Sequence, residues 1–474
     1  MTEPLWRWGD LMAATGADPV AAGPRAVTGL SIDTRTLQPG DLFVAIKGES
    51  QDGHAYVGTA FASGAAAAMV AREFAGAADS GAGVLLRVDD PLAGLNRLGT
   101  AARARATVKT IAITGSVGKT GSKEALRACL ARCGRTHASE KSYNNHWGVP
   151  LTLARMPADT QFGVFEIGMN HPGEITPLSR MVRPEIAIIT TVAAVHIGFF
   201  KSEEAIADAK AEIFDGLLPG GTAILNQDNR HYERLKDKAL AAGAGRVLGF
   251  GLASPAPAHV LAMRMSDQGS QVEAIIDGEP ITYEIGAPGE HYVMNSLAVL
   301  SAVKLVGGDL SAAAAELVNV RAPVGRGQRS RYQLPDGPVM LIDESYNANP
   351  ASVRAALAGL ALTPRDPFGR RIAVLGDMRE LGDQSARLHR ELLEPLLAAG
   401  VDLLLACGPH MRALHDLVPP ARRGAYAASA DELAPALLDT IRAGDAVMIK
   451  GSLGSKMGPL VEALKARLAG GAVS

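Results

Sequence analysis

Short apolar runs separated by helix-length stretches dominate the middle of this chain. The runs cover residues 108–113, 162–167, 185–190 and 222–225. Apolar runs that alternate with helices are typical of strands buried on both faces of a parallel sheet. The pattern therefore predicts a doubly wound α/β sheet in the central part of the chain.

The segments on either side repeat this alternation. Strands are expected at residues 27–32, 42–46, 84–88, 339–342, 371–375, 403–406 and 446–449. Helices are expected at residues 54–63, 91–105 and 294–306. A polar stretch at 260–285 has the pattern of a β-type insertion, and a Pro/Gly/Arg stretch at 321–326 is typical of a linker.

These blocks predict three domains in an α/β chain of 474 residues, a length that suits two to four domains. We expect a small N-terminal α/β domain at 1–106, a central doubly wound parallel sheet at 107–320 and a Rossmann-like domain at 321–474. The last two resemble each other in pattern, which predicts two similar sheets in sequence.

Composition narrows the class of protein. Hydrophobic residues make up 47%, charged residues 20%, and the net charge is −2. These values favour a cytoplasmic globular protein with neither a nucleic-acid partner nor membrane insertion. The first residues lack a basic stretch followed by an apolar run, so no signal peptide is expected. The three cysteines include Cys129 and Cys133, whose spacing fits neither a redox pair nor a zinc half-site.

A phosphate-binding loop is the strongest chemical signal in the sequence. The apolar run at 108–113 leads into a glycine-containing turn that ends in Gly-Lys-Thr, and a helix follows. Backbone N–H groups of such a turn converge on phosphate oxygens, and the helix N-terminus adds positive partial charge. The candidate nucleotide-binding residues are Thr114, Gly115, Ser116, Gly118, Lys119, Thr120 and Gly121.

Within this loop, Lys119 is expected to neutralise the β- and γ-phosphates and Thr120 to bind Mg²⁺. The usual pattern places a glycine five residues before Gly118, but Ile113 stands there and Gly115 comes two places later. The loop is therefore a shortened variant. The alternative interpretation is a strand-to-helix turn that contains Gly-Lys-Thr by chance.

Polar residues follow the other strands of the middle segment. Glu166 interrupts an apolar run, and a buried carboxylate is costly unless it is paired or bound to a metal. Thr190, His196 and Asn226 follow the next two strands. Ligands of open α/β sheets lie beyond the carboxyl ends of the strands, so we expect these groups to meet the phosphate loop there. A salt bridge for Glu166 and a structural role for His196 are the alternatives.

The third segment shows the same arrangement. Polar residues follow its strands at 343–350, 376–382 and 450–452. Asn349 and Pro350 suit the N-cap and first turn of a helix, and for Asn349 alone capping is the better explanation. Three polar loops on one edge nevertheless suggest a second binding face, and two such edges would form an interdomain active site.

Taken together, these residues resemble the Mur ligase family over essentially the whole chain. Within that family, the Asn-Ala-Asn-Pro and Gly-Asp-Met tracts favour the member that adds D-alanyl-D-alanine to a UDP-N-acetylmuramoyl-tripeptide. The matching tracts lie at 31–35, 52–54, 114–120, 144–150, 166–174, 209–212, 346–350, 376–382 and 450–452.

The resemblance implies an ATP-dependent ligase with two Mg²⁺ ions. Thr120 and Glu166 would hold one ion, and Glu166, His196 and Lys210 would serve the second. Lys210 would be carbamylated by CO₂, which turns an ammonium into an anionic oxygen ligand. From the residues alone, Lys210 would be an exposed helical lysine, so its role is wholly inherited. Lys119, Lys210 and His196 are the catalytic candidates.

The resemblance also assigns the substrates. Asn295 would contact adenine, and Arg326 and Asp343 would contact the ribose and phosphates. The UDP-sugar end would use Ser31, Asp33, Arg35, Lys47, Asp52, Gly53 and His54. The remaining substrate-binding candidates are Asn144, Asn145, Tyr346, Asn347, Asn349, Lys450 and Ser452.

Four tracts depart from the family pattern. Tyr292 follows His291 where asparagine is usual, and Ile197-Gly198 follows His196 where Leu-Glu is common. Glu344 replaces an aspartate, and 146–147 varies a stretch that is usually acidic and aliphatic. None of these changes removes a phosphate- or metal-binding group.

The expected reaction is phosphoryl transfer to the tripeptide carboxylate, then attack of the D-alanyl-D-alanine amine on the acyl phosphate. A monomer is expected. Two alternatives stay open: another amide ligase of this family, either tripeptide-forming or a folylpolyglutamate synthase, and a nucleotide-binding regulator that performs no ligation. The third peptide residue, diaminopimelate or lysine, is not determined by the sequence.

Overall fold

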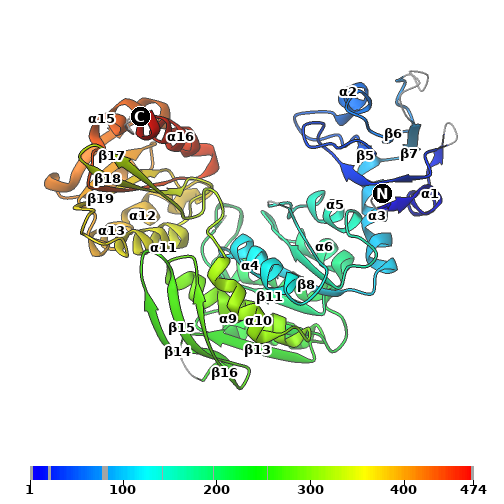
Figure 1. Cartoon of the computed structure of the whole chain (residues 1–474), viewed down its shortest axis with the longest axis horizontal. Coiled ribbons are helices and arrows are strands. Elements are labelled where there is room, and N and C mark those ends of the chain that lie inside the picture. Colours follow the sequence, from blue (N-terminus) through cyan, green and yellow to red (C-terminus); the bar gives the residue numbers. More distant parts are fainter. Residues whose placement is uncertain are drawn as a thin grey trace.

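The computed structural model describes residues 4–19, 23–76, 84–140, 142–195, 197–252 and 255–470. The N-terminal and C-terminal parts lie at opposite ends of the molecule, and the central part lies between and below them (Figure 1). Among the described residues, no helix is long and apolar enough to cross a bilayer.

The N-terminal part contains a five-stranded sheet in the order β2-β7-β6-β5-β4, with a two-stranded β1-β3 sheet beside it. Its strands are β1 (Trp6–Arg7), β2 (Asp18–Pro19), β3 (Ala26–Val27), β4 (Gly29–Ser31), β5 (Asp41–Val44), β6 (Ala67–Ala71) and β7 (Val84–Val88). Its helices are α1 (Trp8–Thr15), the 3-10 helix η1 (Gly53–Tyr56), α2 (Val57–Ala62) and α3 (Pro91–Arg105).

The bounds of β7 and α3 match the predictions, because α3 has clear end signals: Asp90 caps it and Pro91 occupies its first position. The strand predicted at 27–32 is instead divided between β3 and β4, which belong to different sheets. The helix predicted at 54–63 is divided between η1 and α2.

The central part is built on one nine-stranded sheet in the order β16-β15-β14-β13-β12-β11-β8-β10-β9. Its strands are β8 (Lys109–Thr114), β9 (Thr136–Ala138), β10 (Phe162–Glu166), β11 (Ile186–Ile189), β12 (Thr222–Asn226), β13 (Arg246–Gly251), β14 (Ala258–Met265), β15 (Ser270–Ile276) and β16 (Glu279–Ile285).

Helices cover the central sheet on both faces. They are α4 (Lys119–Ala131), α5 (Gly148–Ala154), α6 (Ile175–Val182), η2 (Ile197–Phe199), α7 (Glu203–Ala211), η3 (Glu212–Gly216), α8 (Tyr232–Ala241), α9 (Glu290–Leu305), α10 (Leu310–Glu316) and η4 (Leu317–Asn319). The strands from β8 to β14 are parallel, as predicted. The β structure predicted at 260–285 is confirmed by β14, β15 and β16, which pair antiparallel with one another. These strands extend the central sheet through β14 and do not form a separate insertion.

The C-terminal part has a six-stranded sheet in the order β17-β18-β22-β19-β20-β21. Its strands are β17 (Gln328–Leu334), β18 (Gly337–Glu344), β19 (Arg370–Gly376), β20 (Leu403–Cys407), β21 (Arg423–Ala427) and β22 (Asp445–Lys450). Its helices are α11 (Pro350–Ala361), η5 (Gly382–Gln384), α12 (Ser385–Arg390), α13 (Leu393–Ala398), α14 (Arg412–His415), η6 (Pro420–Arg422), α15 (Ala430–Thr440), η7 (Leu453–Ser455) and α16 (Met457–Gly470).

This sheet is parallel except for the β17–β18 hairpin, which the apolar pattern did not predict. Strand β17 is half-buried or exposed throughout and carries few apolar residues, so it lacks the continuous run on which β18, β19, β20 and β22 were predicted. Strand β21 was not predicted either. Residues 321–327 connect η4 to β17 without regular structure, in agreement with the predicted linker.

Candidate functional site

The loop between β8 and α4 folds tightly at the carboxyl edge of the central sheet. The Lys119 Nζ donates a hydrogen bond to the carbonyl oxygen of Gly115 at 2.6 Å. A Cβ on Gly115 would lie 1.9 Å from Oγ1 of Thr190, and one on Gly118 would lie 2.8 Å from Nδ2 of Asn295. Gly118 also has a φ of 88°. Both positions therefore require glycine.

Neighbouring residues fix this loop to the sheet. The Ser116 N–H donates to the carbonyl oxygen of Thr191 at 2.9 Å. Thr114 ends β8, and Gly121 lies in the first turn of α4. Ile113, which stands at the position of the consensus glycine, is fully buried within β8. The strand therefore continues through Thr114, and the loop begins at Gly115, two residues later than the consensus, as the shortened pattern predicts.

Four buried side-chain oxygen atoms on or next to the phosphate loop and β10 have no hydrogen-bond partner within the part of the chain that the structure describes. They are Oγ1 of Thr114, Oγ1 of Thr120, Oγ of Ser122 and Oε2 of Glu166. Thr120 and Glu166 are the pair that was predicted to bind a metal. The other carboxylate oxygen of Glu166 accepts a hydrogen bond from Nδ2 of Asn144 at 2.7 Å. A hydroxyl and a carboxylate oxygen left unsatisfied by protein are the kind of ligand that Mg²⁺ takes in nucleotide sites. The residues present therefore fit Mg²⁺.

Metal binding here would rely on mixed ligands. In the described ranges, no three His, Cys, Asp or Glu side chains converge on one point. Hydroxyl and phosphate oxygens would have to complete the coordination of an ion at Thr120 and Glu166. His196, which was predicted to share this site, lies outside the described residues.

The prediction of an exposed Lys210 from the residues alone is wrong. Its side chain is on α7 and the residue is only 4% exposed, because its neighbours Ala209 and Ala211 belong to the central core. Burial lowers the pKa of Lys210 well below its ordinary value, and the nearby Lys119 lowers it further. A buried amine with a low pKa is held towards its neutral, nucleophilic form.

Lys119 lies in the same electrostatic environment. Burial lowers the pKa of Lys119, the nearby Arg326 also lowers it, and the carboxylate of Glu166 opposes both effects. The phosphate loop, β10, α7 and the linker thus bring three basic side chains (Lys119, Lys210 and Arg326) and one carboxylate together. Such a surplus of positive charge around a glycine-rich loop suits a polyphosphate.

The linker residue Arg326 connects the central and C-terminal parts. Its guanidinium carbon lies 4.0 Å from the ring centroid of Tyr346, and Nη2 donates to Oγ of Ser142 at 3.4 Å. The Tyr292 hydroxyl donates to the carbonyl oxygen of Arg326 at 3.1 Å. Tyr292, a departure from the family pattern, therefore holds the linker against α9, which also carries Asn295.

The C-terminal edge satisfies its own polar groups. The carboxylate of Asp343 is 4% exposed and accepts hydrogen bonds from the backbone and hydroxyl of Ser345 at 3.1 and 2.7 Å. The Lys450 ammonium forms an ion pair with Glu344 at 2.9 Å and donates to the carbonyl oxygen of Asn347 at 3.1 Å. These groups form a closed network at the ends of β18 and β22.

Two residues of this edge that were predicted to bind substrate make hydrogen bonds to other parts of the protein. Asn349 caps α11 in a reciprocal capping box with Ser352, as its position predicted. The Ser452 hydroxyl donates to the carbonyl oxygen of Ala348 at 3.1 Å and accepts from the backbone of Arg379 at 2.8 Å. Their side chains therefore shape the loops that face the linker.

A direct backbone contact joins the central and C-terminal parts close to residue 196. The Gly198 N–H donates to the carbonyl oxygen of Glu380 at 2.9 Å, and a Cβ on Gly198 would lie 3.0 Å from the backbone nitrogen of Gly382. Ile197 and Leu381 are buried beside it in one shared core. Gly198, another departure from the family pattern, is therefore accommodated by close packing.

In the N-terminal part, the tract at 31–35 forms a tight turn after β4. The Ser31 hydroxyl donates to the carbonyl oxygen of Asp33 at 2.8 Å, and Arg35 pairs with the Asp33 carboxylate at 2.6 Å. The Arg35 side chain is 87% exposed. The turn thus presents a guanidinium to solvent on an ordered loop.

The second predicted UDP-sugar tract is ordered by a histidine. Lys47 forms an isolated β-bridge with Asp52, and the Asp52 carboxylate caps the helix η1 that starts at Gly53. The His54 Nδ1 lies 2.6 Å from Asp52, and its Nε2 accepts from the backbone of Ala71 at 2.9 Å. Both ring nitrogens are therefore used within the protein, and the hydrogen bonds from His54 lower the pKa of Asp52.

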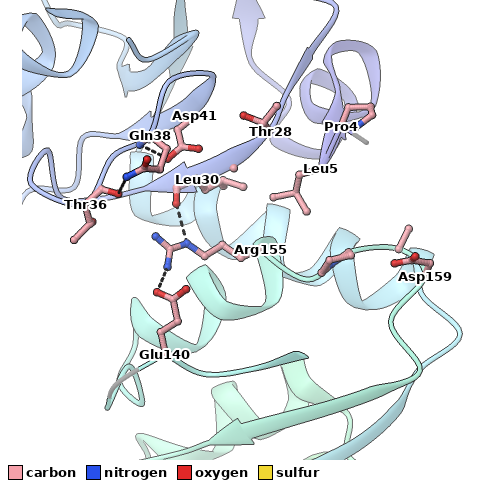
Figure 2. A pocket seen from close by; sticks show the side chains of 13 residues that line it. Pro4, Leu5, Thr28, Leu30, Thr36, Gln38, Asp41, Glu140, Arg155 and Asp159 are labelled. Carbon is pink, nitrogen blue, oxygen red and sulfur yellow. Dashed lines mark hydrogen bonds and ion pairs between the residues drawn. The ribbon is translucent and has the colours of Figure 1, made fainter. Parts of the chain in front are cut away.

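A cavity of about 460 Å³ lies at the seam between the N-terminal and central parts. Figure 2 shows Arg155 crossing this seam: Nε donates to the carbonyl oxygen of Leu30 and Nη1 to Glu140, both at 2.8 Å. Trp6 crosses it as well, through a hydrogen bond of 2.8 Å to the carbonyl oxygen of Ala154. These contacts fix the N-terminal part to the end of α5.

Residues 142–144, which precede α5, contact all three parts of the chain. Asn144 contacts Glu166 in the central part, and Ser142 contacts Arg326 at the start of the C-terminal part. Tyr143 packs against the N-terminal core and lies near enough to Arg35 to act on its pKa. Asn145 does not join them, because its side chain accepts a hydrogen bond from the backbone of residue 148 and starts α5.

Sequence reasoning missed two side chains at this site. Lys123 is fully buried on α4 behind the phosphate loop. Its position four residues after Lys119 places it one turn further along the helix, which was the available signal. Arg155 bridges two domains from the end of a short apolar helix, and nothing local to its sequence indicates a partner in the N-terminal part.

Three family models match the chain. They are the Mur ligase family catalytic domain at residues 26–90, the Mur ligase middle domain at 113–303 and the Mur ligase glutamate ligase domain at 325–453.

Curated relatives match nearly the full length. Ligases named UDP-N-acetylmuramoyl-tripeptide–D-alanyl-D-alanine ligase are similar to this chain. The Rickettsia prowazekii protein is 31% identical over 91% of this chain and 94% of its own length. The Escherichia coli protein is 36% identical over 81% and 82%, and that of Bacillus subtilis is 32% identical over 92% and 93%.

Solved structures agree with this match. A crystal structure of MurF from Acinetobacter baumannii superposes with a TM-score of 0.83 at 27% identity, covering 97% of this chain and 99% of that one. A MurF ligase from Thermotoga maritima in complex with ADP has a TM-score of 0.76 at 22% identity, covering 93% and 98%, and supports the fold.

Proposed function

This chain belongs to the Mur ligase family, and we propose from that premise that it joins D-alanyl-D-alanine to a UDP-N-acetylmuramoyl-tripeptide. The reaction consumes ATP and yields the pentapeptide nucleotide, ADP and phosphate. The observation that carries this proposal is the convergence of Lys119, Lys210 and the unsatisfied oxygens of Thr120 and Glu166 on one sheet edge.

The reaction proceeds in two steps. A carboxylate oxygen of the tripeptide attacks the γ-phosphorus of ATP, the bond from that phosphorus to the bridging oxygen breaks, and ADP leaves. The D-alanyl-D-alanine amine then attacks the acyl carbon, phosphate leaves, and the amine loses a proton. Lys119 is proposed to neutralise charge that develops on the transferred phosphoryl group, and its hydrogen bond to the carbonyl oxygen of Gly115 in the phosphate loop supports this role.

Mg²⁺ would be held by Thr120 and Glu166, with His196 and Lys210 added for a second ion. When bound, it neutralises phosphate charge and polarises the phosphoryl oxygens. Asn144 orients the Glu166 carboxylate towards that position by holding one of its two oxygens.

Lys210 is proposed to act in its carbamylated form. Addition of CO₂ to an amine requires the neutral amine, and burial favours that form here by lowering the pKa of Lys210. Carbamylation would replace a buried amine by an anion among cations. Mass spectrometry of the intact protein in bicarbonate would detect an added CO₂, and a Lys210→Met variant is the matched negative control.

The nucleotide is proposed to lie between α9 and the linker, with Asn295 at the adenine and Arg326 and Asp343 at the ribose and phosphates. The UDP-sugar end is assigned to the exposed turn of Ser31, Asp33 and Arg35 together with the Lys47, Asp52, Gly53 and His54 tract. The acceptor and tripeptide ends are assigned to Asn144, Asn145, Tyr346, Asn347, Asn349, Lys450 and Ser452.

The sheet boundaries support functional units at 1–106, 107–320 and 321–474. The first unit would bind the UDP-sugar, the second would bind ATP, and the third would bind the acceptor D-alanyl-D-alanine. A monomer is sufficient for this division, because all three contribute to one site through residues 142–144. Sedimentation with and without ATP would test the monomer.

The decisive experiment is a product assay with the full chain. ATP, Mg²⁺, the tripeptide nucleotide and D-alanyl-D-alanine should give phosphate and a pentapeptide nucleotide identified by mass. Omission of D-alanyl-D-alanine should abolish the amide product. Supplying the dipeptide nucleotide with diaminopimelate, or a folate with glutamate, tests the other amide ligases. Nucleotide binding without ligation of any acceptor would instead support a regulator.

A further inference from the structure

A second lysine of α4 is buried behind the phosphate loop without a role in the proposed reaction. Lys123 is 0% exposed. Its ammonium donates to the carbonyl oxygen of Ser139 at 2.7 Å and pairs with the carboxylate of Glu124 at 2.5 Å. Burying an ammonium is costly, and the cost is offset only where its hydrogen bonds are well made.

The bond from Lys123 to Ser139 fixes the residue that directly follows β9. Ser139 is 2% exposed, its N–H donates to the carbonyl oxygen of Val164 at 3.2 Å, and its hydroxyl accepts from the backbone of Glu166 at 3.3 Å. The ammonium therefore ties α4 to the point where the chain leaves β9, beside β10, the strand that carries Glu166.

The carboxylate of Glu166 is held by a second residue, Asn144. Five residues after Ser139, Nδ2 of Asn144 holds one oxygen of the Glu166 carboxylate at 2.7 Å. The other oxygen of Glu166 is left unsatisfied within the described ranges, beside the phosphate loop. The direction of that oxygen depends on Asn144, whose backbone carbonyl accepts a hydrogen bond from the N–H of Gly168 at 2.8 Å. It also depends on the backbone of Glu166, whose N–H donates to the Ser139 hydroxyl at 3.3 Å.

We propose that Lys123 is a positioning residue for the Mg²⁺ site. It fixes Ser139, which accepts a hydrogen bond from the backbone of Glu166, so that the Glu166 carboxylate meets Asn144 and keeps one oxygen directed at the metal position. The same helix, α4, carries Lys119 and Thr120 in its first turn, one turn before Lys123. One rigid helix therefore both binds the phosphates and orients the Glu166 carboxylate. The inference concerns Mg²⁺-nucleotide binding and rests on the proposed function only for its effect on ligation.

The ion pair between Lys123 and Glu124 provides a control that distinguishes a positioning role of Lys123 from a role in stabilising α4. Glu124 also accepts a hydrogen bond from Nε of Arg127 at 2.9 Å and is 30% exposed at its side chain, so it keeps a partner and water when Lys123 is changed. Ser139, in contrast, loses a charged donor to a buried carbonyl. The structural consequence of removing Lys123 therefore falls on Ser139 and on the backbone of Glu166, which Ser139 holds.

The test is calorimetric titration of ADP into the full chain at a series of Mg²⁺ concentrations. Lys123→Met keeps the apolar stem and removes the ammonium. The Mg²⁺ concentration that gives half of the Mg²⁺-dependent gain in ADP affinity should rise by about 10- to 100-fold, the range for residues that orient metal ligands. ADP affinity without Mg²⁺ should stay within about twofold, because the phosphate loop is unchanged.

Two further variants make the result specific. Glu124→Gln is the matched control: it removes the ion pair but leaves the Lys123–Ser139 bond, and its Mg²⁺ dependence should equal that of the parent. Asn144→Ala should reproduce the effect of Lys123→Met, and the double variant should be no weaker than either single one within about twofold, because both act on Glu166.

Unchanged Mg²⁺ dependence in Lys123→Met, an equal loss in Glu124→Gln, or additive losses with Asn144→Ala would each overturn the proposal. Should Lys123→Met fail to fold, Lys123→Gln carries the same test, since its shorter side chain cannot reach Ser139 and should weaken Mg²⁺ dependence in the same way. This readout is independent of ligation: a chain that binds Mg²⁺-ADP as described but forms no amide would refute the proposed function and leave this inference standing.

Discussion

The central and C-terminal sheets both end in polar loops, yet their edges differ in how the polar groups are satisfied. At the central edge, oxygens of Thr120 and Glu166 lack partners among the described residues, and burial depresses the pKa of Lys119 and Lys210. At the C-terminal edge, Lys450 is paired with Glu344. Without a ligand, the central edge keeps buried polar groups that lack partners. At the C-terminal edge, the protein's own polar groups pair with one another.

The two edges therefore suit different roles, although both lie at the carboxyl ends of parallel strands. Buried groups that the protein leaves unpaired store a cost that a charged ligand can relieve, so such residues favour binding at the expense of stability. Groups that satisfy one another build a rigid face on which a substrate can rest. Substitutions at the central edge should therefore lower activity without lowering stability, and substitutions at the C-terminal edge should lower stability first.

The largest effect is expected from Lys119→Met. The rate constant kcat should fall by about 10²- to 10³-fold, the range for loss of one charge-stabilising donor. The free energy of unfolding without ligand should be unchanged or higher, because burial disfavours this ammonium. Phosphate release and urea unfolding measure the two quantities. Lys109→Met, at an exposed ion pair of the preceding strand, is the control, and both values should stay near the parent.

Lys210→Met should abolish most of the activity and change how stability depends on pH. Burial places the folded-state pKa of Lys210 well below the ordinary 10.5, so between these two values the unfolded chain binds a proton that the folded chain lacks. The free energy of unfolding of the parent should therefore rise with pH in that window. The variant should be more stable than the parent at neutral pH.

That advantage should shrink as the pH approaches 10.5, where both states of the parent are neutral. Thermal unfolding in CO₂-free buffer from neutral to alkaline pH checks the sign. A variant less stable than the parent across the whole pH range would contradict the expectation that substitutions at the central edge do not lower stability.

At the C-terminal edge, Lys450→Met should cost about 3 kcal/mol of unfolding free energy, because it leaves Glu344 largely buried without its partner. Adding Glu344→Gln should recover much of that loss. Urea denaturation measures both. Arg412→Ala removes one member of an exposed pair in the same part of the chain and should cost less than about 0.5 kcal/mol. Similar losses in the two variants would show that burial is not the cause.

The smallest effect concerns the cap of α11. Asn349→Ala should lower the free energy of unfolding by about 1 kcal/mol, since it removes the acceptor of the capping box. Asn349→Asp keeps an oxygen at the same place and should retain parental stability. Calorimetric melting of the two variants distinguishes capping from any wider role of Asn349 in the fold; equal losses would argue against capping.

Local pattern was sufficient for much of the architecture. The apolar runs located the inner parallel strands of two sheets but missed β9, β13 and β21, and Asp90 with Pro91 marked the start of α3. The phosphate loop was recognisable without its first glycine, because a buried strand precedes it and a helix follows. Strand β17 escaped prediction, since its few apolar residues give no run and its place is set by pairing with β18.

Tertiary structure alone decided the environment of the charged residues. Lys210 has the sequence of an exposed helical position, and it is buried because helices and strands from distant parts of the central domain pack around α7. Lys123 meets Ser139 sixteen residues away, and Tyr292 meets Arg326 across the linker. Sequence periodicity fixes which residues form elements. The pKa values and partners at the site depend on which distant segments exclude water, and that is a property of the packed chain.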